Sequence, residues 1–95
     1  MFGDLFRAKR SFASADELFE VVRSLIAEMR ANGQTGAAKE LDDGFRCLNG
    51  LTDGWGLFLE SIDAVLRRSF EDLTASQGAT LADIRAAVHR AIHRR

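Results

Sequence analysis

The chain of 95 residues is 46 % hydrophobic and 28 % charged, with a net charge of −1, which excludes a disordered chain and fits one domain with a single core. The charge is uneven: residues 1–10 carry +2, residues 11–80 carry −6 and residues 81–95 carry +3. Basic ends therefore flank an acidic middle, and no basic face for nucleic acid covers the whole domain.

The first predicted helix covers residues 15–31. Ser14 and Glu17 form the pattern of a capping box, in which the Ser hydroxyl accepts from the Glu backbone N–H and the Glu side chain reaches back. Asn32 and Gly33 supply the left-handed stop that ends many helices. The apolar stripe at spacings of four and three is Leu18, Val22, Leu25 and Met29, widened by Phe19 and Ile26.

A second helix is predicted to start at Thr35, whose hydroxyl is placed to cap it. Oppositely charged side chains three or four residues apart should pair along both of these helices. These pairs are Glu20 with Arg23, Lys39 with Asp43, and Asp42 with Arg46. The apolar stripe of the second helix is Ala37, Ala38, Leu41, Phe45 and Leu48.

Two more helices follow in the pattern. The third has about 23 residues and the fourth begins after Gly78, with Thr80 as its cap and Asp83 at the third position. The third stripe is Trp55, Phe58, Leu59, Ile62, Val65, Leu66, Phe70 and Leu73, and the fourth is Leu81, Ile84, Val88 and Ile92. We expect Trp55 to fill one end of the core.

The stretch LNGLTDGWG, residues 48–56, decides between two architectures. Apolar residues recur every seven positions from Leu41 to Leu73, so one helix over 36–76 could act as a coiled-coil strand, which needs a partner chain. Against this, the three glycines of the stretch would each cost about 1 kcal/mol in a helix. Such a helix would also be about 60 Å long, far longer than its neighbours. We favour a break at Asn49-Gly50, with Thr52 or Asp53 as the next cap.

The predicted fold class is all-α: a four-helix antiparallel up-and-down bundle formed by one domain, residues 1–95, with residues 1–13 as a candidate N-terminal arm. The alternative is three helices with one long central helix over 36–76, in a dimer. In either case we expect a homo-oligomer, most simply a dimer.

No constellation of residues predicts catalysis. His89 and His93 share one helix face at a metal-site spacing, but no third ligand lies beside them in the sequence, so they are weak metal candidates. Cations near a helix C-terminus explain the pair equally well. Phosphate-loop and hydrolase patterns are missing from the sequence. We therefore expect no enzyme activity, no metal and no cofactor.

The function predicted by this subtraction is a small protein–protein interaction module. The alternative is a small DNA-associated regulator that uses the basic C-terminal helix, although the third helix is long for a helix-turn-helix and the basic residues cluster at the wrong end for base reading. Nucleic-acid binding is therefore the weaker hypothesis. The candidate partner-binding residues are Phe2, Leu5 and Phe6 in the N-terminal arm and Arg85, Arg90 and Arg94 in the C-terminal helix.

The sequence also suggests a location. No stretch approaches 18 uninterrupted apolar residues, so we expect no membrane span. The first residues do not follow the pattern of a signal peptide. We expect a cytoplasmic protein of bacterial type. The lone Cys47 is expected to be a packed side chain rather than a reactive thiol.

Overall fold

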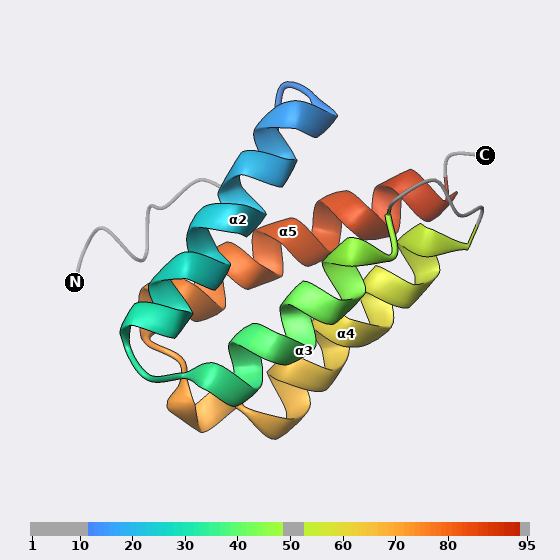
Figure 1. Cartoon of the computed structure of the whole chain (residues 1–95). Coiled ribbons are helices and arrows are strands. Elements are labelled where there is room, and N and C mark those ends of the chain that lie inside the picture. The colour runs from blue at the N-terminus through green and yellow to red at the C-terminus, as the bar shows by residue number, and fades with distance from the viewer. Residues whose placement is uncertain (1–11, 49–52, 94–95) are drawn as a thin grey trace.

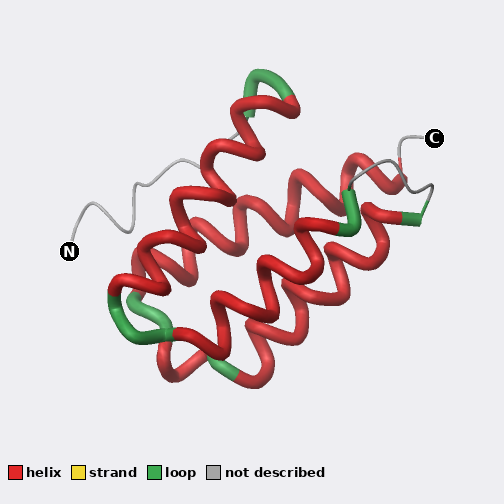
Figure 2. The backbone as a smooth tube through the Cα atoms, in the orientation of Figure 1, coloured by secondary structure: helices red, strands yellow, loops and turns green. Residues whose placement is uncertain are grey.

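The computed structural model describes residues 12–48 and 53–93, which form four α-helices and one 3-10 turn, without a strand among them. Figures 1 and 2 show the all-helical architecture, which confirms the predicted four-helix bundle. None of the described helices has the length and apolarity that crossing a membrane would require. The elements are α2 (Ala15–Ala31), α3 (Thr35–Arg46), α4 (Gly54–Arg68), η1 (Phe70–Asp72) and α5 (Ala75–His93).

Helix α2 begins and ends where the sequence predicts. The Ser14 hydroxyl accepts a hydrogen bond from the backbone N–H of Glu17, at 3.2 Å. The Glu17 carboxylate reaches back one residue further than expected, to the N–H of Ala13 at 2.7 Å. At the other end Gly33 has φ +78, and the N–H of Gln34 bonds to the carbonyl of Met29 at 2.8 Å. This is a complete Schellman stop, which reverses the chain toward α3.

The long helix over 36–76 is wrong. Helix α3 ends at Arg46 and α4 begins at Gly54, and Figure 1 shows the two lying side by side. Close packing explains Gly54: a Cβ there would overlap the carbonyl of Cys47. Asp53 is the N-cap residue of α4 but makes no side-chain cap bond. The other expected cap, Thr52, lies outside the described residues.

The start of α5 also differs from the prediction. The helix begins at Ala75, so Gly78 lies inside it and Thr80 is not its cap. The actual cap is Thr74, whose hydroxyl accepts from the N–H of Gln77 at 3.0 Å. The Gln77 side-chain oxygen accepts from the N–H of Thr74 in return, also at 3.0 Å. This is a capping box, and the extended backbone of Leu73 separates it from η1. The third helix is therefore shorter than predicted, because α4 ends at Arg68.

Consecutive helices run antiparallel and pack as neighbours, most extensively α3 with α4. In Figure 1 the C-terminal turns of α2 lie beside α3 and α5, and Phe19 in its N-terminal half contacts Phe45 of α3 and Trp55 of α4. Three ion pairs connect the sequential helices: Arg30 to Asp42, Arg68 to Glu40, and Arg85 to Asp63. Exposed pairs of this kind add only about 0–1 kcal/mol each, so burial of the core stabilises the bundle.

Most of the predicted stripe residues lie in the core or pack against it. Phe70 is the exception, because α4 ends at Arg68 and Phe70 lies exposed on η1. Phe58 and Met29 are the largest fully buried side chains, from α4 and α2. Trp55 is half-buried and packs against the edge of the core, as expected for one end of the bundle. The buried apolar cluster is Leu18, Val22, Leu25, Ile26, Met29, Ala37, Ala38, Leu41, Phe58, Ile62, Val65, Leu81, Ile84 and Val88.

A group of polar side chains around the buried Gln77 closes the end of the bundle opposite Trp55. Gln77, which is 1 % exposed, and Gln34 pair their side-chain amides reciprocally, at 2.8 and 2.9 Å. Gln77 also donates to Glu28 at 2.9 Å, and Gln34 to the carbonyl of Asp72. We call this group, with Thr74, the amide clasp. Because Gln34 uses its side chain here, it starts α3 without a side-chain cap, and Thr35 is not the cap.

Candidate functional site: an aromatic cleft between α2 and α3

The described surface feature with the chemistry of a binding site is a cleft between α2 and α3. Its volume is about 400 Å³, within the range of protein binding pockets. Its walls combine apolar rings with guanidinium groups. The lining residues are Phe19 and Arg23 from α2, Asp42, Phe45 and Arg46 from α3, and Leu48 just after it. We call this the aromatic cleft.

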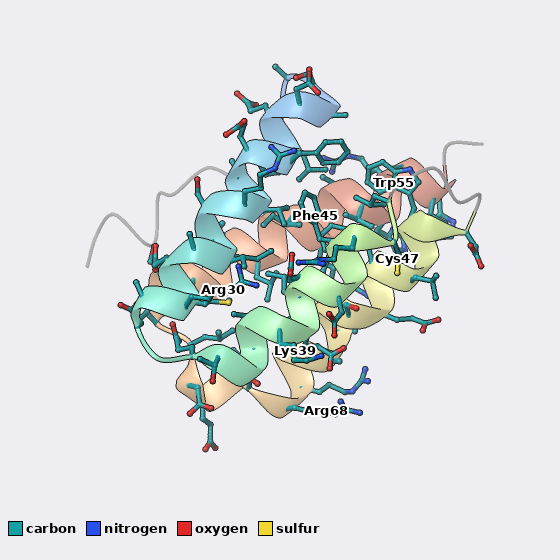
Figure 3. All side chains as sticks on the ribbon, viewed as in Figure 1. Arg30, Lys39, Phe45, Cys47, Trp55 and Arg68 are labelled. Carbon is teal, nitrogen blue, oxygen red and sulfur yellow. The ribbon has the colours of Figure 1, made fainter. Side chains whose placement is uncertain are left out.

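Aromatic contacts across three helices build the base of the aromatic cleft. The Phe19 and Phe45 rings meet edge to face, with centroids 5.7 Å apart. Phe19 also contacts Trp55 of α4 at 6.2 Å, and Phe45 contacts Phe58 at 5.7 Å. Each such pair adds about 0.5–1.5 kcal/mol beyond area burial. Phe19 and Phe45 are nevertheless only half-buried. Figure 3 shows Phe45 and Trp55 at this end.

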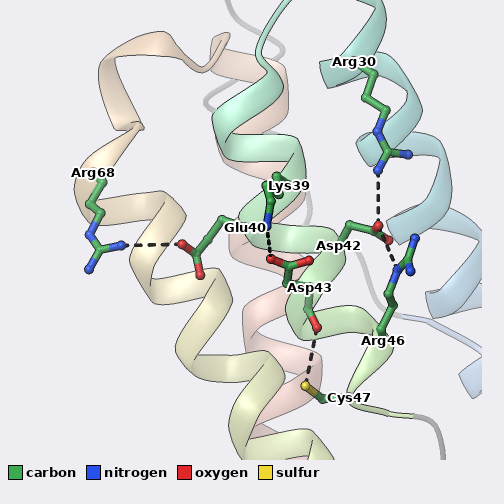
Figure 4. A network of polar contacts seen from close by, with 8 residues as sticks. All are labelled: Arg30, Lys39, Glu40, Asp42, Asp43, Arg46, Cys47 and Arg68. Atoms are coloured by element: carbon green, nitrogen blue, oxygen red, sulfur yellow. Dashed lines mark hydrogen bonds and ion pairs between the residues drawn. The ribbon is translucent and has the colours of Figure 1, made fainter.

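Cationic groups surround these rings. The Arg23 guanidinium lies over the Phe45 ring, 5.7 Å from its centroid, a cation–π arrangement. Arg46 donates to Asp42 at 3.0 Å, and Arg30 donates to the same carboxylate oxygen at 3.2 Å. Figure 4 shows Asp42 between these two guanidinium groups. Two positive charges therefore share one negative charge.

The bonds of Asp42 leave its carboxylate little room for further partners. Its side chain is 16 % exposed, whereas that of Arg46 is 76 % exposed. The outer faces of the arginines are therefore presented to solvent and the carboxylate is not. Arg23 pairs with Glu20 at 3.3 Å, outside the cleft lining. The lining residues include two guanidiniums and one carboxylate, so they carry a net charge of +1.

A larger groove of about 510 Å³ runs between α3 and α4. Three of its four carboxylates are engaged within the fold: Glu40 pairs with Arg68, Asp43 with Lys39, and Asp63 with Arg85. Figure 4 shows the first two pairs. Groups of three or more ligating side chains placed to hold a metal do not occur in the described part of the chain. Its ion pairs join α3 to α4 and α4 to α5.

Two of these ion pairs shift the pKa of their basic partner. The hydrogen bond to Asp43, reinforced by its charge, raises the pKa of Lys39. The hydrogen bond to Asp63 raises the pKa of Arg85. Both side chains are already cationic at neutral pH, so these shifts describe pairing and do not prepare a group for proton transfer.

The predicted packing of Cys47 is seen in the structure. The residue is half-buried, and its Sγ lies 3.4 Å from the carbonyl oxygen of Asp43, to which the thiol donates. The adjoining contact between α3 and α4 is very close. A Cβ on Gly44 would overlap the Ser61 side chain, which is buried beneath it.

His89 and His93 lie together on the last turns of α5, with ring centroids 4.2 Å apart. Both are exposed. The structure thus confirms the shared face, and none of the described His, Cys, Asp or Glu side chains joins them in a group of three. An exposed pair of tilted rings at a helix C-terminus fits the electrostatic explanation given by the sequence.

The predicted partner-binding residues are only partly visible. Phe2, Leu5, Phe6 and Arg94 lie outside the described residues, so the N-terminal arm stays a prediction. On α5, Arg85 is bound to Asp63 and Arg90 is exposed. The amide clasp fixes the N-terminal turn of α5 inside the bundle. A DNA-reading helix needs that turn free for the groove, so this arrangement does not favour the DNA-binding alternative.

The sequence pattern does not predict the aromatic cleft, although it assigns its lining residues to other roles. Phe19 and Phe45 were assigned to the stripes of two helices, and Arg23 and Arg46 to local ion pairs. The available signal was that Phe19 lies at the edge of its stripe rather than at the centre; nothing comparable marked Phe45. Comparison with known protein families, with curated proteins and with solved structures gives no match for this chain.

Proposed function

We propose that this chain is a small interaction module that binds another protein through the aromatic cleft and needs no catalytic chemistry. The supporting observation is the combination of half-buried rings and exposed guanidiniums around one depression. Aromatic and arginine side chains are the residue types that carry most binding energy in protein interfaces. In the bundle alone Phe19 and Phe45 are only half-buried, so a bound partner would bury them further.

Existing contacts hold the aromatic cleft in shape. Phe45 is fixed from beneath by the buried Phe58 and from the side by Phe19. Arg46 is oriented by Asp42. A partner would therefore lose little free energy in ordering this surface, which is the main benefit of a preorganised site. The groove between α3 and α4 lacks such rings.

Site-directed photo-crosslinking tests the proposal. A photoreactive side chain at position 46, on the rim of the aromatic cleft, should trap one protein from cells that contain this chain. The same side chain at Arg67, which is exposed on α4, should not trap it. The trapped protein is then purified and its dissociation constant is measured by calorimetry.

Replacing Phe45 with Ala should weaken the purified complex by at least about tenfold, because truncation of an interface anchor costs about 2 kcal/mol or more. Phe45→Leu keeps most of the apolar volume, so a folded variant with intermediate affinity separates binding from unfolding. Phe70→Ala, on the distant η1 turn, should leave the affinity unchanged. Equal trapping from position 67, or an affinity that ignores both changes at Phe45, would refute the proposal.

A further inference from the structure

The charge balance of the aromatic cleft identifies the kind of partner segment that fits it. This inference rests on the proposed function and goes beyond it. We infer that the occupant is an acidic segment of a partner protein that carries a bulky apolar side chain. The apolar side chain would pack on Phe19, Phe45 and Leu48, and flanking carboxylates would meet Arg23 and Arg46.

The argument for negative charge begins with Asp42. It is the one carboxylate among the lining residues, and it accepts hydrogen bonds from both Arg30 and Arg46. With Asp42 largely shielded by these bonds, the exposed edges of Arg23 and Arg46 form the polar rim. A carboxylate of a partner can accept from either guanidinium without displacing Asp42, because each guanidinium has five N–H donors.

The argument for an apolar anchor begins with the rings. Phe19, Phe45 and Leu48 are half-buried and form an apolar surface around the cleft. A volume of about 400 Å³ suits one large side chain with its neighbouring backbone. An acidic side chain alone would leave these rings in contact with water. A purely apolar side chain would remove water from the guanidiniums without replacing the hydrogen bonds that the water makes. Both features are therefore needed in one ligand.

A nucleic acid is the competing anion, since bases stack on aromatic rings and phosphates pair with Arg. The wider charge pattern disfavours it. Residues 11–80, which contain the aromatic cleft, carry a net charge of −6, so a polyanion that extended past the two arginines would meet repulsion. A short acidic peptide needs only the local excess at the cleft.

Tryptophan fluorescence provides a direct readout, because Trp55 is the only Trp and its ring lies 6.2 Å from Phe19. The probes are a short Trp-free peptide in which Phe and Leu alternate with Glu, the same peptide with every Glu replaced by Lys, and a short mixed-sequence single-stranded DNA. We expect a saturable fluorescence change with the acidic peptide and backbone NMR shifts centred on the aromatic cleft. The Lys peptide should bind at least about tenfold more weakly, through like-charge repulsion.

Charge reversal on the rim sharpens the test. Arg46→Glu should weaken binding of the acidic peptide by at least about tenfold and improve binding of the Lys peptide. Arg67→Glu makes the same change of charge on exposed α4 surface and should alter neither affinity by more than about twofold. Both positions are exposed, and unchanged helical circular dichroism would show that the variants fold.

The inference fails if the Lys peptide binds as well as the acidic one, if the DNA binds more tightly than either, or if neither peptide shifts the resonances of the cleft. In each of these cases the photo-crosslinking experiment still decides the proposed function by itself. A trapped partner that depends on Phe45 but uses a basic or neutral segment would keep the proposed function and overturn only the acidic occupant.

Discussion

At the scale of single residues, two glycines show how closely α3 and α4 approach each other. Gly44 faces Ser61 across the helix contact, and Gly54 faces the carbonyl of Cys47 at the turn between the helices. Neither has a positive φ, so a Cβ is excluded by the neighbouring helix and not by the backbone conformation. Both glycines lie where the heptad pattern had allowed one continuous helix.

Replacing Gly44 with Ala should destabilise the protein. The new methyl overlaps Ser61 and forces the helices apart, at a cost of about 1–3 kcal/mol. Ala regains about 1 kcal/mol of helix propensity, so the net loss should reach at most about 2 kcal/mol. Urea unfolding followed by circular dichroism measures it as a lower midpoint at an unchanged slope.

Gly78→Ala is the matched control for that measurement. Gly78 lies inside α5, and a Cβ there meets nothing within 4 Å. The same substitution should therefore stabilise the protein by about 0.4–1 kcal/mol, because Ala has less freedom to lose on folding. If both variants moved the midpoint in the same direction, the close helix contact at Gly44 would not be the cause.

At the scale of elements, the amide clasp joins parts of the chain that are far apart in sequence. Gln77 of α5 bonds to Glu28 of α2 and to Gln34 in the turn that follows it. Helices α2 and α5 otherwise have few contacts with each other. The clasp therefore contributes much of what attaches α2 to the last helix.

Gln77→Ala should cost about 2–3 kcal/mol, since it removes the side-chain oxygen that accepts from the N–H of Thr74 and leaves the half-buried amide of Gln34 without its side-chain partner. Thermal or urea unfolding gives the total loss. Hydrogen exchange should locate it, with faster exchange at the C-terminal end of α2 and the first turn of α5. Ser76→Ala alters the exposed residue next to Gln77 and should change the unfolding midpoint and the hydrogen exchange only a little. A Gln77 variant as stable as the Ser76 one would show that the clasp is dispensable.

The elements also show what the sequence could predict. Helix α2 matches its prediction because Ser14, Glu17 and Gly33 mark its ends by local hydrogen bonds alone. The predicted start of α5 is wrong because a glycine inside a helix resembles a helix end in the sequence. The correct local signal is Thr74 followed by Gln77 three residues later, the pattern of a capping box. The role of Gln34 could not be predicted, since its partner Gln77 lies 43 positions away. The aromatic cleft likewise depends on how α2 packs against α3 and α4, which the local sequence pattern does not determine.

At the scale of the whole molecule, the apolar stripe that could have formed a coiled coil faces the core. The Leu41 and Ile62 side chains, which would have formed a coiled-coil stripe, are fully buried between the chain's own helices. This apolar stripe is therefore not available to form a coiled-coil dimer. Self-association stays a prediction, which rests on the basic ends and the acidic middle of the sequence. The one large hydrophobic side chain exposed among the described residues is Phe70, at 64 %, next to Glu71 and Asp72.

We expect self-association to be weak and to place the basic, aromatic N-terminal segment of one copy near Phe70 of another, where Glu71 and Asp72 supply opposite charge. Light scattering should then give the single-chain mass of 10.5 kDa at micromolar concentration and a rising mass at higher concentration, since a small patch supports only a transient contact. Phe70→Asp, and separately deletion of residues 1–12, should each abolish the rise. A mass that stays constant would refute the contact, and a stable dimer in both variants would place it elsewhere.

The amide clasp also bears on how the chain folds as it is synthesised. The interfaces α2–α3, α3–α4 and α4–α5 each join neighbours in sequence, a topology of local contacts that favours fast folding. The clasp is different, because Glu28 must wait for Gln77, 49 positions later. Helices α2, α3 and α4 can therefore associate on a nascent chain before the joint between α2 and α5 exists. Until α5 emerges, Glu28 and Gln34 remain hydrated, and α2 is attached to the growing bundle through α3.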